Sequence, residues 1–351
     1  MLDFPKIGQG IGAYKWNDSN QRLIRHAALN GLNLIDTAEE YDDGNSECVI
    51  GSAIKGIREK VILSSKFSPH NNSYSKVLQS LDNSLKRLNT DYLDIYQLHW
   101  PNPSVPIEET IEALNFLKTN GKIRYVGFGN MTLAELKFIH KLIKIDTFQI
   151  EYNLFDRSIE PDIYNFCLEN NILIIGYSPL DQGYIADGNI KKYVIKLSEK
   201  YGKSLAQIAL NWIVNKKNIL PIPKFSTFEH FQEISDSDFK IDQHDFEYIN
   251  DNVTPINYIK PKLINVINEG QNNRKTYLNL NDAKLNKSGY VPSPIQLSEV
   301  ISKDKNIKPI RLIKINDLQY NLIEGRIRFW AWVLAYGEEN PIPSYIRSYQ
   351  K

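Results

Sequence analysis

The first 250 residues predict an α/β protein built as a (β/α)8 barrel. Strand-like runs alternate with helical runs in eight units of about 30 residues each, which is the repeat that such a barrel requires. Three of the strand-like runs end in a polar side chain, at Asp36, Lys66 and His99. A doubly wound sheet is the competing architecture. The glycine-rich segment 8–12 lacks the spacing of a dinucleotide-binding turn, so the barrel is favoured.

The expected elements follow the periodicity of the apolar residues. A first unit at 6–13 precedes strands expected at 32–35, 61–65, 92–98, 123–128, 148–152, 172–177 and 219–222. Helices are expected at 19–30, 46–57, 75–88, 107–120, 132–143, 160–170, 190–201, 204–215, 227–235 and 243–252. In a barrel, the carboxyl ends of these strands would meet at one mouth.

The end of the chain differs from the barrel units. Residues 268–293 are rich in Asn, Lys, Gly and Pro, which is typical of a loop or linker. Beyond them, helices are expected at 295–301 and 328–336, and strands at 310–315, 320–323 and 342–346. We therefore expect a barrel over 1–253, a linker and the start of a tail module over 254–293, and a small α+β module over 294–351.

The composition is that of a soluble globular protein. Of the 351 residues, 42% are apolar and 24% are charged, and no apolar run reaches the length of about 18 residues that predicts a membrane span. The first five residues lack the features of a signal peptide. Cys48 and Cys167 are far apart and have no metal-ligand spacing. We therefore expect a cytoplasmic location, two structural thiols and no metal site.

Charge is distributed unevenly along the chain. From Asn257 onward there are 15 Lys and Arg against 8 Asp and Glu, whereas the preceding residues have 27 against 33. An acidic body with a basic tail indicates two domains. The tail could favour phosphates or another anion, although a solvated basic face explains the same pattern. Nucleic-acid binding is not expected, because the excess charge is modest and no helix-turn-helix is evident.

Four polar side chains are expected to converge at the mouth of the barrel: Asp36, Tyr41, Lys66 and His99. Reduction of a carbonyl group delivers hydride to carbon, so a proton donor must meet the charge that develops on oxygen. A tyrosine has an ordinary pKa of about 10, and a neighbouring ammonium would lower it. Lys66 would supply that ammonium and Asp36 would hold it. Each residue alone has a structural explanation, but the four together predict a site.

These residues lie in segments that resemble the aldo-keto reductase family. The matching segments, in family order over about residues 1–253, are 36–38 with Tyr41, 65–67, 98–100, 127–130, 149–153, 177–180 and 222–224. The resemblance implies a (β/α)8 barrel that binds a nicotinamide dinucleotide without a Rossmann domain. It also implies that Tyr41 is the general acid, that Lys66 and Asp36 tune its pKa, and that His99 orients the substrate.

The same resemblance implies a set of cofactor-binding residues. Asn130 and Gln149 would hold the carboxamide of the nicotinamide, and Tyr177 would stack on its ring. The pyrophosphate path would be lined by Ser178 and Leu180, the adenosine end by Lys224 and Glu233, and the first loop by Gly12, Ala13 and Tyr14.

Four positions depart from the family pattern. At the adenosine end, Phe225 replaces a small polar residue, His230 an arginine and Ile234 an asparagine. Losing a hydroxyl and a guanidinium weakens a site for the 2′-phosphate of NADP(H). NADP(H) is therefore favoured only slightly, and NAD(H) stays possible. Gly129 replaces a serine beside Asn130, which removes one hydrogen bond to the carboxamide.

The substrate would be a small-molecule carbonyl compound. An aromatic-lined pocket is suggested by Tyr14, Trp16, Phe67 and Trp100. Such a pocket fits a small aldehyde, a sugar- or nucleotide-linked carbonyl, or an aromatic carbonyl equally well. Tyr152 is either a further pocket residue or part of the core.

The tail resembles the ParB/sulfiredoxin-like nucleotide-binding fold over about residues 260–350. Segments 308–313 and 320–331 carry the resemblance, with Gly325 ending a strand and Arg328 opening a helix. A helix N-terminus with an arginine suits a phosphate, so Gly325, Arg326 and Arg328 would bind a nucleotide or phosphate. The usual histidine or paired arginine is missing, and so is a redox cysteine. The alternative is a docking or dimerisation module.

Three functions follow from these observations. The first is an NAD(P)H-dependent carbonyl reductase. The second is a nicotinamide redox sensor or regulatory protein whose tail binds a nucleotide or a partner. The third is a tail that acts separately as a small kinase or nucleotidase. The intact set of Asp36, Tyr41, Lys66 and His99 favours the enzyme, because a sensor needs no proton donor.

Overall fold

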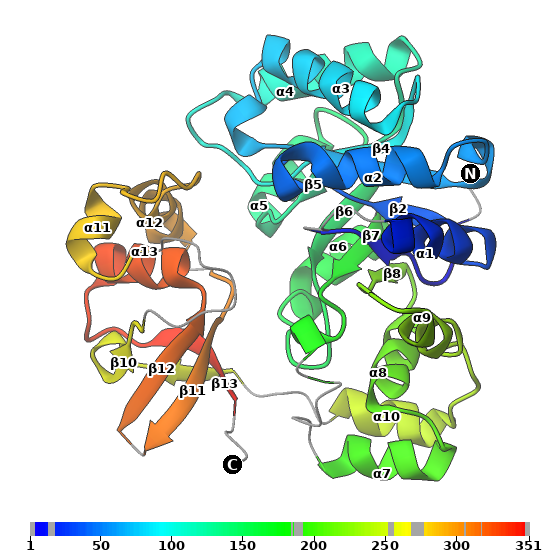
Figure 1. Cartoon of the computed structure of the whole chain (residues 1–351). Coiled ribbons are helices and arrows are strands. Elements are labelled where there is room, and N and C mark those ends of the chain that lie inside the picture. Colours follow the sequence, from blue (N-terminus) through cyan, green and yellow to red (C-terminus); the bar gives the residue numbers. More distant parts are fainter. Residues whose placement is uncertain are drawn as a thin grey trace. The chain divides into compact units, whose positions relative to one another are not determined.

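The computed structural model describes residues 4–12, 18–183, 185, 192–251, 256–267, 277–304, 307–316 and 318–347. The chain divides into two compact units, Met1–Asn252 and Val253–Lys351 (Figure 1). Each unit has its own sheet and its own hydrophobic core. Within the described ranges, no helix has the length and apolar character needed to cross a membrane.

The first unit is built around eight parallel strands, each paired with the next one along the chain. They are β1 (Gln9–Gly10), β2 (Leu34–Asp36), β3 (Ile62–Phe67), β4 (Leu93–Leu98), β5 (Ile123–Gly129), β6 (Thr147–Glu151), β7 (Leu173–Tyr177) and β8 (Ile219–Ile222). Main-chain N–H groups of Gly8 and Gly10 donate to the carbonyls of Pro221 and Pro223, at 2.9 and 3.0 Å. The first strand therefore also meets the last, and the sheet closes into the (β/α)8 barrel that the sequence predicts.

Helices connect the barrel strands, and two more follow the last strand (Figure 1). They are α1 (Asp18–Leu29), α2 (Asn45–Ala53), α3 (Tyr74–Leu88), α4 (Ile107–Thr119), α5 (Leu133–His140), α6 (Asn165–Glu169), α7 (Lys192–Tyr201), α8 (Leu205–Val214), α9 (Phe228–Ser235) and α10 (Gln243–Asp251). In α3, the buried residues Val77, Leu81, Leu85 and Leu88 recur every three or four positions and pack in the core. The helix expected over 160–170 is α-helical only from Asn165, because Glu160–Tyr164 forms a π-helical turn.

The interior of the barrel changes from apolar to polar along the strands. Side chains alternate between the two faces of a strand. The buried cluster of Leu34, Ile62, Ile95, Ile175, Leu220 and Ile222 marks the inward positions. Two residues further along β2, β3 and β4, the same alternation brings Asp36, Ser64 and Gln97 to the inward face, and all three are buried. The carboxyl ends of these strands thus supply a polar layer above an apolar one.

The second unit has a mixed five-stranded sheet in the order β10-β12-β11-β13-β9. Its strands are β9 (Asn257–Ile259), β10 (Ile264–Asn265), β11 (Ile310–Asn316), β12 (Gln319–Glu324) and β13 (Ile342–Arg347), and its helices are α11 (Leu280–Lys284), α12 (Pro294–Asp304) and α13 (Arg326–Tyr336). The three helices pack together and α13 contacts β11 (Figure 1). The unit has a core of its own, to which Phe329, Trp330 and Trp332 belong.

The segment expected to be linker contains structure that the sequence analysis missed. Strands β9 and β10 and helix α11 all lie within 254–293, and Asn279 caps α11 by accepting a hydrogen bond from the Asp282 N–H. Strands of two or three residues show no periodicity, and they form here because β13 and β12 offer them a pairing edge. Residues 268–276 lie outside the described residues.

Candidate active site

The four residues expected at the barrel mouth do converge. Asp36 is the last residue of β2, Lys66 lies near the end of β3, His99 directly follows β4, and Tyr41 opens a short 3-10 helix, Tyr41–Gly44. The Lys66 Nζ lies 2.7 Å from Asp36 Oδ2 and 5.0 Å from the centre of the Tyr41 ring. The rings of Tyr41 and His99 are nearly perpendicular, with centroids 5.6 Å apart. Asp36, Lys66 and His99 lie close together because they come from the carboxyl ends of the neighbouring strands β2, β3 and β4.

The carboxylate of Asp36 is held by a network that sequence analysis largely missed. Its Oδ1 accepts hydrogen bonds from Ser64 Oγ at 2.8 Å, Gln149 Nε2 at 2.9 Å and Gln97 Nε2 at 3.3 Å. Lys66 is also buried, and its second acceptor is the Thr37 carbonyl at 2.7 Å. A buried ion pair needs such extra hydrogen bonds to offset the loss of water. The signal for Ser64 and Gln97 was their place two residues after an inward apolar residue.

The net electrostatic effect on Tyr41 differs from the expectation. Burial raises the pKa of the Tyr41 hydroxyl, and the attraction of Lys66 opposes this rise only in part. For Lys66, burial acts to lower the pKa, but Asp36 and Tyr41 together outweigh it and the pKa is raised. The predicted lowering of the Tyr41 pKa is therefore wrong in its net direction, although Lys66 contributes in the expected sense. Tyr41 is protonated and Lys66 is charged at neutral pH, which suits a proton donor beside a fixed positive charge.

His99 has a carboxylate partner, Glu40, which the sequence analysis did not identify. Its Nδ1 lies 3.0 Å from Glu40 Oε2, and the other carboxylate oxygen of Glu40 accepts a hydrogen bond from Ser68 Oγ at 2.9 Å. Burial lowers the pKa of His99, and the hydrogen bond to Glu40 opposes this shift. Ser68 follows β3 and caps the 3-10 turn Pro69–Asn71, so the loop after β3 positions the carboxylate.

Three of the expected nicotinamide contacts lie on or next to β5, β6 and β7: Asn130 directly follows β5, Gln149 is in the middle of β6 and Tyr177 ends β7. Asn130 has a left-handed backbone with φ of 58°, its Nδ2 donates to the His99 carbonyl at 3.1 Å, and its Oδ1 accepts from the Tyr177 hydroxyl at 2.9 Å. The hydrogen bond from the Tyr177 hydroxyl to Asn130 holds the half-buried Tyr177 ring in place. Gln149 donates its amide to Asp36, so the cofactor-side and proton-donor residues belong to one hydrogen-bonded assembly. At position 129, a Cβ would lie 2.7 Å from the His99 carbonyl oxygen, which explains the glycine there.

Comparison with known proteins agrees with this geometry. A family model described as the aldo/keto reductase family matches residues 6–253. The chain belongs to the aldo/keto reductase family. Methylglyoxal reductase YeaE of Escherichia coli K12 is 39% identical over 242 residues, covering 66% of this chain and 84% of that protein. The NADH-specific methylglyoxal reductase of Escherichia coli K12 is 30% identical over 264 residues, covering 60% and 81%.

Solved structures lead to the same family. A crystal structure of an aldo/keto reductase from Klebsiella pneumoniae in complex with NADP and acetate has a TM-score of 0.67 and 32% identity, and the alignment covers 72% of this chain and 92% of that one. The protein is thus an oxidoreductase, as the sequence predicts. The barrel accounts for the match to the family model, which ends at the start of the second unit.

The turn after β8 explains two of the departures from the aldo/keto reductase pattern. Phe225 and Ile234 are 3% exposed and pack with Phe231 in a small core cluster beside α9. Their side chains therefore face the protein interior. Lys224 and His230 are exposed near the start of α9, which is capped by Thr227. The basic groups of this turn are accessible, whereas the two apolar replacements serve packing. Glu233, further along α9, is half-buried.

Of the described aromatic residues expected to line the substrate pocket, Trp100 is exposed, whereas Phe67 and Tyr152 are buried in the core. Phe67 is fully buried against Tyr96, with ring centroids 5.0 Å apart, because its place in β3 faces the helices and not the barrel interior. It is not retained as a substrate contact. Tyr152 is also core, stacked on Trp212 at 5.3 Å. Trp100 is 40% exposed and its ring lies beside His99. Ala13, Tyr14 and Trp16 lie outside the described residues.

The remaining expected contacts lie on loops near the strand ends. Gly12 is half-buried and its carbonyl accepts a hydrogen bond from Ser46 Oγ at 2.5 Å. Ser178 directly follows β7 with φ of 49°, and Leu180 packs on the main core. Asn153 donates to the Ser178 carbonyl at 3.1 Å, which holds this loop in place.

In the second unit, the residues expected to bind phosphate have internal partners. Arg328 donates from Nη1 to the Pro309 carbonyl at 2.7 Å and to the Lys308 carbonyl at 3.2 Å, and its Nη2 lies 3.4 Å from Glu324. Arg326 donates to the Ile267 carbonyl. Gly325 has φ of 101° at the junction of β12 and α13. The arginines hold loops to the helix start, so the expected nucleotide site is not supported.

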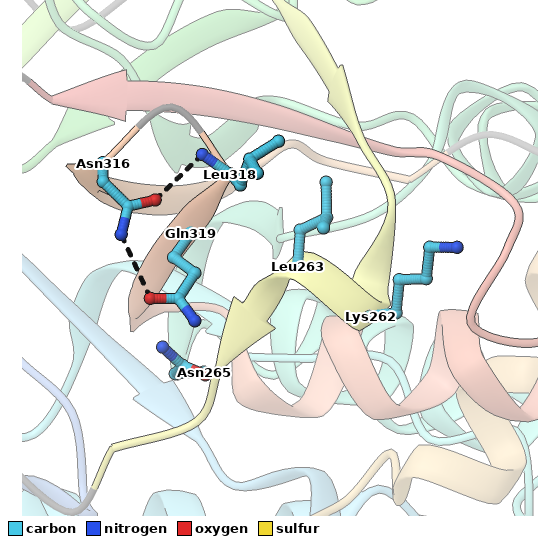
Figure 2. A pocket seen from close by; sticks show the side chains of 6 residues that line it. All are labelled: Lys262, Leu263, Asn265, Asn316, Leu318 and Gln319. Atoms are coloured by element: carbon cyan, nitrogen blue, oxygen red, sulfur yellow. Dashed lines mark hydrogen bonds between the residues drawn. The ribbon is translucent and has the colours of Figure 1, made fainter.

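A hollow of about 420 Å³ lies elsewhere in the second unit, at the edge strand β10 and the β11–β12 turn. Figure 2 shows its lining, which consists of Lys262, Leu263, Asn265, Asn316, Leu318 and Gln319. The Asn316 amide donates to Gln319 at 3.2 Å and its oxygen accepts from the Leu318 N–H at 2.9 Å. These contacts belong to the turn itself, and none of the predicted site residues lines the hollow.

Proposed function

We propose that this protein reduces a small aldehyde or ketone with NADPH or NADH, using Tyr41 as the general acid. The observation that carries the proposal is the convergence of Tyr41, the Lys66–Asp36 ion pair and His99 at the ends of adjacent strands. A proton donor, a fixed positive charge and an orienting group are what carbonyl reduction requires from a protein.

Residues on β6 and β7 and directly after β5 fit a nicotinamide cofactor. The Tyr177 ring, fixed through its hydroxyl to Asn130, offers an aromatic face, and the amides of Asn130 and Gln149 have the chemistry that a carboxamide needs. Gly12, Ser178 and Leu180 would border the remainder of the cofactor, with Lys224 and Glu233 at the adenosine end. We propose that NADP(H) is preferred slightly. A relative solved with NADP and a relative named as NADH-specific support use of either form.

The mechanism assigns one task to each side chain. When bound, the reduced nicotinamide supplies the hydride. His99 orients the carbonyl oxygen, and the Tyr41 hydroxyl donates its proton to that oxygen as charge develops. The Lys66 ammonium stabilises the tyrosinate that remains, and Asp36 holds Lys66 in place at 2.7 Å. Proton uptake from solvent then restores Tyr41 for the next turnover.

We propose a small α-oxoaldehyde such as methylglyoxal as the substrate. Two relatives carry methylglyoxal reductase in their names and a third is named glyoxal reductase. The exposed Trp100 ring beside His99 would cover one side of a compact substrate. Sugar- and nucleotide-linked carbonyls are the competing substrates, and a panel of each class separates them.

The test compares wild type with Tyr41→Phe. Fluorescence titration measures binding of NADPH and NADH, and absorbance of the reduced nicotinamide measures turnover with methylglyoxal. We expect both proteins to bind the cofactor, and the variant to lose about 10²–10⁴-fold in turnover. Cofactor binding without turnover of any carbonyl by the wild type would replace the enzyme with the redox-sensor alternative.

For the second unit we propose the ParB/sulfiredoxin-like fold. The order of β12, Gly325 and α13 supports it. We propose no phosphate site there, because Arg326 and Arg328 are bonded to main-chain carbonyls.

A further inference from the structure

The carboxylate of Glu40 occupies a defined place between His99 and the loop after β3. Its Oε2 lies 3.0 Å from His99 Nδ1 and its Oε1 accepts the Ser68 hydroxyl at 2.9 Å. The adjacent Glu39 holds the same loop independently, since its Oε1 accepts the Ser68 N–H at 2.7 Å and the Asn71 amide at 2.8 Å. Both glutamates therefore hold the loop after β3, and of the two it is Glu40 that contacts the His99 imidazole.

The chemistry of a carboxylate decides where the imidazole carries its proton. For Glu40, burial acts to raise the pKa, but hydrogen bonds from His99 and Ser68 and the charge of His99 outweigh it, so the pKa is lowered. An ionised carboxylate is an acceptor only. The His99 nitrogen that faces it must then be the one that bears hydrogen, because two acceptors 3.0 Å apart would repel each other.

We propose that Glu40 is a positioning residue that fixes His99 as the Nδ1–H tautomer, so that Nε2 bears a hydrogen only when the ring is doubly protonated. The inference rests on the proposed function in one respect: the carbonyl oxygen is the acceptor that this hydrogen would serve. In neutral His99 the Nε2 atom then has a lone pair and no hydrogen. Only the imidazolium form donates a hydrogen bond from Nε2 to the carbonyl oxygen of the substrate.

The Nδ1–H tautomer of His99 makes carbonyl reduction depend on pH. The groups that act on His99 are Glu40, Lys66, Asp36 and the Tyr41 ring, and His70 acts on Glu40 from the loop after β3. Burial is the largest influence and lowers the pKa of His99, Lys66 adds to this, and the two carboxylates oppose it. Reduction should therefore be fastest at acid pH and should slow as pH rises through a pKa below the usual histidine value.

Glu40→Gln tests the tautomer directly. The glutamine amide can donate to Nδ1, which allows neutral His99 to carry its hydrogen on Nε2. For wild type, kcat/KM should fall about tenfold per pH unit above the His99 pKa, measured from about pH 5.5 to about pH 8. For Glu40→Gln it should change less than about twofold over that range. Glu39→Gln, which removes a neighbouring carboxylate without touching His99, should keep the wild-type slope.

A second measurement reads the tautomer without turnover. Two-bond ¹⁵N–¹H correlation spectra, with the His99 signal assigned by its loss in His99→Asn, should show the Nδ1–H form in wild type above the titration and the Nε2–H form in Glu40→Gln. An Nε2–H tautomer in wild type, or an unchanged pH slope in Glu40→Gln, overturns the proposal. If wild type reduces no carbonyl, the proposed function fails, and the spectra still decide the tautomer.

Discussion

Both units place a basic side chain beside the end of a strand, and they use it in opposite ways. In the barrel unit, the Lys66 ammonium is buried 2.7 Å from the Asp36 carboxylate and 5.0 Å from the Tyr41 ring. In the second unit, Arg328 stands four residues after Glu324 and donates to two main-chain carbonyls. The Lys66 ammonium therefore lies between an ionised partner, Asp36, and the Tyr41 ring. Arg328 also lies 3.4 Å from the Glu324 carboxylate, but its two shorter hydrogen bonds hold the segment before β11.

The difference teaches what separates the cation that we propose to act in catalysis from a structural one. Both residues are charged, partly or fully buried and adjacent to a strand end, so position alone does not distinguish them. A carboxylate neighbour does not distinguish them either, because Glu324 lies 3.4 Å from Arg328. The Lys66–Asp36 pair differs because it is buried beside Tyr41, whose pKa both charges influence. The two shortest hydrogen bonds of Arg328 go to main-chain carbonyls, which carry no net charge.

Lys66→Met should have the largest effect. It leaves the Asp36 carboxylate buried without its cation, which should destabilise the barrel by about 3–5 kcal/mol. It should also lower turnover by about 10²–10⁴-fold, because the tyrosinate loses its stabilising charge. Chemical denaturation and cofactor oxidation measure the two effects.

A double variant separates those effects. In Asp36→Asn with Lys66→Met, the uncompensated charge is gone, so stability should partly return while turnover should not. If turnover recovered together with stability, Lys66 would be a structural cation like Arg328.

Arg328→Met should have a smaller effect, restricted to the second unit. Loss of the bonds to the Lys308 and Pro309 carbonyls should cost about 1–3 kcal/mol of unfolding free energy. Turnover should stay within about twofold of wild type. Urea unfolding followed by tryptophan fluorescence measures the first quantity, with Lys303→Met, an exposed cation on α12, as the control. If Arg328→Met left the stability unchanged but abolished binding of ATP, Arg328 would bind a phosphate after all.

His230→Arg should have the smallest effect. His230 is exposed near the start of α9, and an arginine there could bind the 2′-phosphate of NADPH through two hydrogen bonds. The preference for NADPH over NADH should rise by about tenfold, equivalent to about 1.4 kcal/mol. Stability should hardly change. His244→Arg, an exposed histidine on α10, is the matched control. An equal gain for both cofactors would show that the arginine acts on something other than the 2′-phosphate.

The sequence by itself determined the barrel and the identity of the four central residues. Eight short apolar strands alternate with amphipathic helices, and local periodicity is enough to reveal that pattern. Parallel strands in a barrel bring their carboxyl ends together, so the sequence alone is enough to group Asp36, Lys66 and His99. Tyr41 followed from the loop directly after Asp36 and from the resemblance to the aldo-keto reductases.

Only the tertiary structure decided the electrostatics and the partners. The direction of the Tyr41 pKa shift depends on how burial and the Lys66 charge balance, which no local pattern encodes. The Glu40–His99 contact joins residues 59 positions apart through the loop that Ser68 holds. Phe67 and Phe225 became core residues because their backbone positions face the helices. Strands β9 and β10 exist only because a longer strand pairs with them, since so short a segment cannot offset its own ordering entropy.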